Sequence, residues 1–413
     1  MKKFSIAFLL LNVFIGTAQE VQKDTIVESL KETVDGHSMK FTGLDERLSE
    51  MSSDLSGLKK ISVSGYIQAQ YDSYDYDTQP TVTNTFSIRR ARVKFAYKAA
   101  DGVKFVVQPD FAIDKVSMKD AYVVLNDRWT NTFALTMGQF DRPSYEVEYS
   151  SGSMESLERS KLSAVLYPGE KEVGAKLEAN FETKYNLPLK LQLAVVNGNF
   201  GTGAIANQVK DIDSQKDIMT RATYSLKLPS SGLGIDFGGH GYFGHTTVLA
   251  DDTFTDVNNV AFAAKKGDLL KKQWLGAEMQ IYYDFLGGVS LKGEYISGTI
   301  SGSTNAAQAN KDFAYNAVKE FKGFYTQLIK NIGKSNQAVL KFDMFDPNKN
   351  ISGNEVSNKS DLKYSAWSFS WQYFFDENVK IVAGYSIPKH ESTTNIADAG
   401  KKNTFTLRLQ AKF

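Results

Sequence analysis

The sequence of 413 residues has no cysteine, only eight prolines and, beyond its first residues, no long hydrophobic run. Without cysteine there is no disulfide framework and no site for lipid attachment. A helical membrane protein is also excluded, because the mean hydropathy is −0.32 and no later segment approaches the roughly 18 apolar residues that a spanning helix needs. The formal net charge of +1 favours no particular partner, and nothing indicates nucleic acid.

Residues 1–18 have the composition of a secretory signal peptide. Lys2 and Lys3 form its charged start, residues 4–15 are apolar, and residues 16–18 are small enough for cleavage. A short membrane anchor is the alternative, but the apolar stretch is too short to span a bilayer. Removing the two lysines leaves a mature net charge of +1 − 2 = −1.

Residues 19–58 follow a helical period. Six apolar residues are spaced alternately by three and four, which is the heptad pattern: Phe41, Leu44, Leu48, Met51, Leu55 and Leu58. We therefore predict a short periplasmic helical segment that forms a coiled coil of about two to three heptads. The alternative is one amphipathic helix packed on the base of the domain that follows.

The period changes to two at residue 61. Residues 404–413 show it most clearly, because one parity is entirely apolar and the other entirely polar, and the chain ends on Phe413, as does the closing strand of many bacterial outer-membrane barrels. Sixteen such segments occur; the weakest is 323–329, where neither parity is clearly apolar. We predict that residues 59–413 form an all-β domain, a 16-stranded antiparallel transmembrane β-barrel.

The lengths of the connections support a barrel. Those after even-numbered strands are short, for example 99–102, 286–288 and 376–378, whereas most of those after odd-numbered strands are long, such as 141–171 and 244–273. Short periplasmic turns opposite long outer loops are typical of outer-membrane barrels, and a soluble protein made of hairpins has no reason to sort its loops by parity. With an even strand count, both chain ends are expected on the periplasmic side.

The polar parity of the strands is expected to face a water-filled lumen, because the sheet must close on itself in the bilayer with its apolar parity toward lipid. Basic residues outnumber acidic ones on that parity, which would lower the barrier for anions. Eight residues are predicted to line the pore: Arg90, Arg92, Lys94, Lys98, Arg221, Lys341, Arg408 and Lys412. The alternative is a wall of mixed charge with little selectivity.

The connection 141–171 is too long for a simple hairpin loop, and we predict that it folds inward and constricts the pore. Its excess of acidic residues would then face the basic wall and create a transverse field that orients dipolar solutes. Five charged residues are assigned to this constriction: Arg142, Glu146, Glu148, Glu158 and Arg159.

Four short motifs resemble those of the phosphate-selective porin O and P family. They are Ser-Ile-Arg-Arg-Ala-Arg at 87–92, Gly-Gln-Phe-Asp-Arg-Pro at 138–143, Leu-Glu-Arg-Ser at 157–160 and Asp-Met-Phe-Asp-Pro-Asn at 343–348. The resemblance covers most of residues 61–413. It implies a sixteen-stranded, trimeric outer-membrane channel whose basic lumen passes phosphate-like anions.

By position, the resemblance places Arg90, Arg92 and Lys94 in the family's basic run, and Arg142 and Arg159 in its constriction loop. The sequence also departs from the family pattern. An acidic residue, Asp141, stands where family members often have a basic one, and Ser-Tyr at 144–145 replaces the usual Phe-Gly.

Other patterns are discounted. Residues 239–244 match a dinucleotide fingerprint, but they lie inside a predicted strand with no helix after it. His240 and His245 have no accompanying carboxylate or cysteine ligand set in the sequence, so no metal site is predicted. With no nucleophile or phosphate-loop motif, neither enzyme activity nor a cofactor is expected.

The sequence therefore predicts an outer-membrane porin for passive diffusion of small hydrophilic solutes, with a preference for phosphate-like anions. Two alternatives stay open: a non-selective general porin, and a structural tether that links the membrane to the cell wall or a periplasmic partner through residues 19–58. The expected partners are outer-membrane lipid, further copies of the chain in a homotrimer, and small anionic or polar solutes.

Overall fold

The computed structural model describes residues 60–76, 83–112, 116–144, 152–167, 169–198, 211, 213–302, 316–396 and 402–413. The predicted signal peptide and the predicted helical segment 19–58 lie outside these ranges. None of the helices in the described ranges has both the length and the hydropathy of a membrane-crossing helix.

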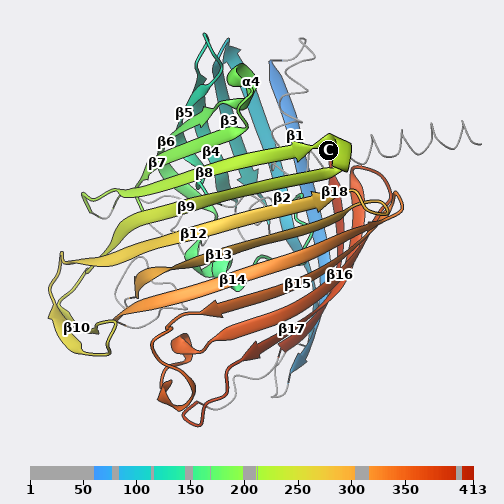
Figure 1. The fold of residues 1–413 in the computed structure, drawn as a ribbon. Helices are drawn as coiled ribbons and strands as arrows, with labels where there is room; N and C mark the ends of the chain where they lie inside the picture. The colour runs from blue at the N-terminus through green and yellow to red at the C-terminus, as the bar shows by residue number, and fades with distance from the viewer. Residues whose placement is uncertain are drawn as a thin grey trace, which may run out of the picture.

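The described chain forms one closed antiparallel β-barrel (Figure 1). Its sheet has 18 strands, of which two, β10 (Asp252–Thr255) and β11 (Ala261–Ala264), form a short hairpin in the connection between β9 and β12, leaving 18 − 2 = 16 in the barrel wall. The wall strands in order are β1 (Ile61–Tyr76), β2 (Asn84–Ala100), β3 (Val103–Asp110), β4 (Ser117–Asn126), β5 (Phe133–Asp141), β6 (Lys171–Asn180), β7 (Leu189–Val196), β8 (Asp217–Leu228), β9 (Leu233–Thr247), β12 (Leu269–Tyr283), β13 (Val289–Gly302), β14 (Ala317–Ile332), β15 (Asn336–Asp346), β16 (Tyr364–Phe374), β17 (Val379–His390) and β18 (Lys402–Lys412).

The first and last strands close the ring. β1 pairs with β18 over eleven residue pairs, from Tyr66↔Lys412 to Tyr76↔Lys402, and Gly65 exchanges two backbone hydrogen bonds of 3.0 Å with Phe413. Closure leaves no unpaired edge among the sixteen described wall strands, which a barrel in hydrocarbon requires. The prediction of a 16-stranded antiparallel barrel is therefore confirmed.

The two faces of the wall differ as the alternation predicts. In β18 Leu407 and Leu409 are 43% and 49% exposed on the outside, whereas Arg408 between them is 3% exposed on the inside. The same outward band of exposed apolar side chains runs around the barrel, including Phe95, Leu275 and Trp367. Such a band is the lipid-facing surface of an outer-membrane barrel.

The connections between strands also differ in length between the two ends of the barrel. Short turns, two of them containing α4 (Glu182–Tyr185) and the 3₁₀ turn η3 (Pro229–Ser231), lie at one end, and the hairpin β10–β11 belongs to the other (Figure 1). The 3₁₀ turns η5 (Gly353–Glu355) and η6 (Lys359–Asp361) lie in the long connection between β15 and β16. The hairpin had not been predicted, since its strands are only four residues long.

β14 is much longer than the predicted segment 323–329, and its two faces explain why its alternation is weak. Its outward face is apolar in the middle of the strand, but its inward face also carries buried Phe321, Tyr325 and Ile329. Both parities carry apolar residues among polar ones, because lipid lies on one side and the connection between β5 and β6 packs on the other.

Candidate constriction site

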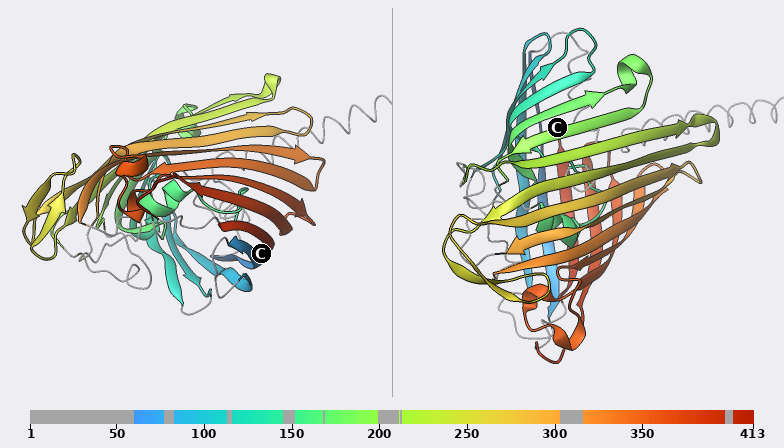
Figure 2. Two further views of the ribbon diagram at one scale, coloured as in Figure 1. Left: turned by 90° about the horizontal axis from the view of Figure 1, so that it is seen from below. Right: turned by 60° about the vertical axis from the view of Figure 1, so that its left-hand side comes forward.

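The connection between β5 and β6 folds into the barrel. Its described residues include the short helix α3 (Lys161–Leu166), which packs on β14 and β15 from inside; Figure 2 shows α3 within the ring of strands. Ser160 caps this helix by accepting a hydrogen bond of 3.0 Å from the backbone N–H of Ser163. We refer to residues 142–170 as the inner loop.

The wall holds the inner loop by its backbone carbonyls. Side chains of four neighbouring strands donate hydrogen bonds to five loop carbonyl oxygens: Gln410 to Gly152, Lys380 to Met154, Gln372 to Glu155, Arg408 to Leu157 and Lys341 to Glu158. These donors satisfy carbonyl groups that would otherwise be buried without partners. Two residues predicted to line the pore, Lys341 and Arg408, therefore fix the loop that narrows it.

An apolar cluster fixes the other half of the inner loop. Leu162, Val165 and Leu166 of α3 are fully buried, and Tyr167 accepts a hydrogen bond of 2.9 Å from the indole N–H of Trp274. The rings of Trp274 and Tyr242 stack with their centroids 4.1 Å apart. The inward face is therefore apolar and closed to water here, because the inner loop covers this part of the wall.

Two wall glycines make room for leucines of the inner loop. A Cβ on Gly323 would lie 2.9 Å from Leu162 Cδ1, and a Cβ on Gly384 would lie 2.5 Å from Leu157 Cδ1. Side chains at these positions would push the loop off the wall.

Glu158 joins the inner loop to the closing seam of the barrel. Its carboxylate receives Arg89 from β2, with Nε–Oε1 2.8 Å and Nη2–Oε2 2.5 Å, and Arg408 from β18, with Nη2–Oε1 2.5 Å. Gln68 and Gln70 on the intervening strand β1 accept hydrogen bonds from Arg89 and Arg408 respectively. We call Glu158, Arg89 and Arg408 the clasp. With the two glutamines it connects the inner loop to three adjacent strands, β2, β1 and β18.

The clasp keeps Glu158 ionised. The side chain of Glu158 is 56% exposed, and its partial burial would raise the pKa, but the positive charges of Arg89 and Arg408 outweigh this effect and lower the pKa of Glu158 to about 2, from an ordinary value of 4.5. Because the folded pKa is depressed, the stabilisation is complete above pH 4.5 and is lost as the pH falls toward 2.

We therefore expect Glu158→Gln to lower the thermal unfolding temperature of the detergent-solubilised barrel by a few degrees at pH 7. The difference in unfolding temperature between the variant and the unmodified protein should be the same at pH 5 as at pH 7, and it should shrink between pH 4.5 and pH 2. Thermal melts followed by circular dichroism can measure it. A gap that stayed constant down to pH 2 would contradict the clasp.

Two β-bulges place cations on the inward face of the wall, although strict alternation would assign these residues to the outward face. In β2 the pairing passes from Gln68↔Arg90 to Ala69↔Ile88, so Arg89 is an extra residue, and its side chain is only 8% exposed, on the inner side. In β4 the pairing passes from Gln108↔Asp120 to Pro109↔Met118, which makes Lys119 the extra residue.

Sequence analysis missed Arg89 and Lys119 because a bulge shifts parity by one. Pro109 was the one available signal for the second bulge, since proline cannot donate to a sheet ladder and is tolerated at bulges. No residue in the run 87–92 marks the first.

Glu170 lies in the middle of a second ionic group. Its buried carboxylate forms an ion pair with Arg159, and Arg90 and Arg92 each lie 3.9 Å from it. Burial tends to raise the pKa of Glu170, but the charges of Arg159, Arg92, Lys119 and Arg90 hold it below the ordinary value. Arg92 also donates to Asp110, with Nε–Oδ2 2.8 Å. The structure thus brings predicted Arg90, Arg92 and Arg159 together.

The remaining predicted residues lie elsewhere. Arg142 pairs with Glu172 at 3.1 Å, Arg221 pairs with Glu278 at 2.6 Å, and Lys94 is buried in the wall. Lys98 is exposed next to the start of β1, where its backbone N–H donates to Lys60. Glu146 and Glu148 lie outside the described residues.

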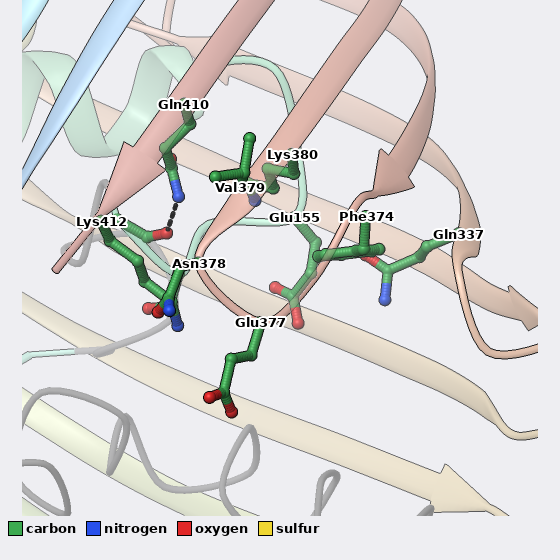
Figure 3. A pocket seen from close by; sticks show the side chains of 11 residues that line it. Glu155, Gln337, Phe374, Glu377, Asn378, Val379, Lys380, Gln410 and Lys412 are labelled. Atoms are coloured by element: carbon green, nitrogen blue, oxygen red, sulfur yellow. Dashed lines mark hydrogen bonds between the residues drawn. The ribbon is translucent and has the colours of Figure 1, made fainter.

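Lys412 lies at the short-turn end of the barrel. It lines a pocket where residues 152–155 of the inner loop meet the turn between β16 and β17, together with Glu155, Glu377 and Asn378 (Figure 3). Glu155 is held there by Lys292 at 2.8 Å.

His240 does have carboxylate neighbours, contrary to the sequence analysis, because pairing of β9, β12 and β13 brings Glu278 and Glu294 beside it. The three ligand atoms lie within 4.8 Å of one another. His240 contacts Glu294 at 2.8 Å and Arg221 donates to Glu278, so both carboxylates already have a partner within the protein.

Comparisons with known proteins agree with this geometry. The family model described as phosphate-selective porin O and P matches residues 61–413. No curated protein matches the sequence. Among solved structures, OprB of Pseudomonas putida is similar with a TM-score of 0.59 at 10% identity, covering 89% of this chain and 97% of that one.

Two further structures share the fold. The anion-selective porin from Comamonas acidovorans has a TM-score of 0.54 at 10% identity, covering 86% of this chain and 99% of that one. OmpT of Vibrio cholerae in its trimer form has a TM-score of 0.50 at 10% identity, with the same two coverages, 86% and 99%.

Proposed function

Because this chain belongs to the phosphate-selective porin O and P family, an outer-membrane channel family, we propose that its pore prefers anions and passes small phosphate-like solutes by passive diffusion. The observation that carries the proposal is the charge of the constriction, where the inner loop faces β1, β2, β4 and β18. Solutes that pass the inner loop must pass this group of side chains.

The constriction has an excess of positive charge. We define the constriction group as Glu158 and Glu170 of the inner loop, the six cations that interact with them, and the two further carboxylates that interact with those cations. The cations are Arg89, Arg90, Arg92, Lys119, Arg159 and Arg408, and the further carboxylates are Asp72 and Asp110. The balance is 6 − 4 = +2. In a narrow, low-dielectric passage such an excess raises the local concentration of anions and opposes cations.

The test is the zero-current potential of the purified protein in a planar bilayer under a potassium chloride gradient. We expect the sign that marks chloride as the more permeant ion, and a larger potential at low salt, where screening is weaker. A potential of the opposite sign would refute the anion preference and leave the channel intact. A potential near zero would favour the non-selective porin.

Orientation and assembly belong to the same proposal. The short turns and both ends of the barrel are proposed to lie on the periplasmic side, since outer-membrane barrels carry their long loops outside. A homotrimer is proposed because the family resemblance implies one and the similar OmpT structure is described as a trimer. Chemical cross-linking in detergent would detect it.

A further inference from the structure

Glu170 has an unusual backbone conformation for its position. Its φ is +69° and that of the preceding Gly169 is +76°, so two consecutive residues adopt left-handed conformations. A side chain with a Cβ disfavours this region, and residues held there cluster at functional sites. In this conformation the Glu170 carboxylate lies among the cations, and the residue is only 5% exposed.

The surroundings of Glu170 offer more positive charge than one carboxylate uses. Arg159 pairs with it directly, whereas Arg90 and Arg92 stand off at 3.9 Å, beyond hydrogen-bond distance. The Nε of Arg90 is buried with no hydrogen-bond acceptor, although the Arg90 side chain as a whole is 24% exposed to the lumen. A second oxyanion that reaches the exposed part of Arg90 would therefore meet positive charge that Glu170 does not compensate.

We infer that the Glu170 carboxylate competes with permeating oxyanions for the cations around it, and that this competition determines how long such a solute stays in the constriction. This inference rests on the proposed function. A binding group in a channel must attract a solute and also release it. The tethered carboxylate weakens the hold of Arg90, Arg92, Arg159 and Lys119 on an incoming carboxylate or phosphate, because it already occupies part of their donor capacity and charge.

The test measures how an oxyanion blocks chloride current through single channels. We expect Glu170→Gln to be blocked by inorganic phosphate at roughly a tenfold lower concentration than the unmodified channel, because one negative charge about 4 Å from the arginines has been removed. The same measurement with succinate as the blocking ion tests whether carboxylates are held in the same way as phosphate. A shift with either probe supports the inference and identifies the oxyanion, and no shift with either overturns it.

The control is Glu355→Gln in the outer 3₁₀ turn η5, which removes the same charge at an exposed site and should leave both block concentrations unchanged. If Glu170→Gln does not assemble, Arg90→Gln serves instead: it should raise the phosphate concentration needed for block, and an unchanged value overturns the inference. An unmodified channel without anion preference would refute the proposed function, whereas anion preference with equal block in both proteins refutes only this inference.

Discussion

Replacing Leu162 with aspartate is expected to raise the single-channel conductance by roughly twofold or more, because it releases the inner loop from the wall. Leu162 is fully buried between α3 and the wall and lies over Gly323. A carboxylate cannot be buried there without a partner, so α3 will leave the wall and the lumen will widen. The barrel itself should persist, since its strand pairing does not involve this residue.

The matched control is Ala164→Asp, which adds the same charge to the same helix at an exposed position and should leave the conductance close to that of the unmodified protein. Heat-modifiable migration in gel electrophoresis would verify that both variants form barrels. A folded Leu162→Asp channel of unchanged conductance would show that the inner loop does not limit the flow of ions.

Removing three cations from the constriction should reverse the ion preference. The variant carries Arg89→Gln, Arg90→Gln and Lys119→Gln, which changes the balance of the constriction group from +2 to 3 − 4 = −1. Arg92 and Arg159 are kept, because their loss would leave Asp110 and Glu170 buried without their partners, and Glu158 keeps Arg408. The zero-current potential under a salt gradient is then expected to change sign.

A control for total charge replaces three exposed lysines near the β10–β11 hairpin, Lys265, Lys266 and Lys271, with glutamine. Charges more than about 10 Å away are largely screened at 0.1 M salt, so this variant should keep the potential of the unmodified channel. If both triple variants shifted the potential equally, selectivity would depend on the net charge of the protein and not on the constriction.

The barrel could be predicted from the sequence because its two environments repeat at every strand. Lipid outside and water inside impose alternation, and residues 404–413 show it without exception. The prediction failed where a third environment intervenes. The inward Phe321 and Tyr325 contact neither lipid nor bulk water but belong to the cluster under the inner loop, and only the folded loop reveals that neighbour.

The candidate site was predictable only in part for a related reason. Parity assigns Arg90, Arg92 and Arg408 to the lumen, but it cannot say that Arg408 holds Glu158 while Arg90 keeps a donor without an acceptor. Partnerships of this kind join residues more than 200 positions apart, such as Glu158 and Arg408, and they depend on where the inner loop crosses the wall.

The two bulges suggest how channels of this architecture can change their permeability by very small genetic steps. A one-residue insertion in the middle of a strand, if absorbed as a bulge, adds one inward side chain while the flanking residues keep their faces. Arg89 and Lys119 occupy such positions. Length differences of a single codon inside a membrane strand are then candidate determinants of which ions a relative admits.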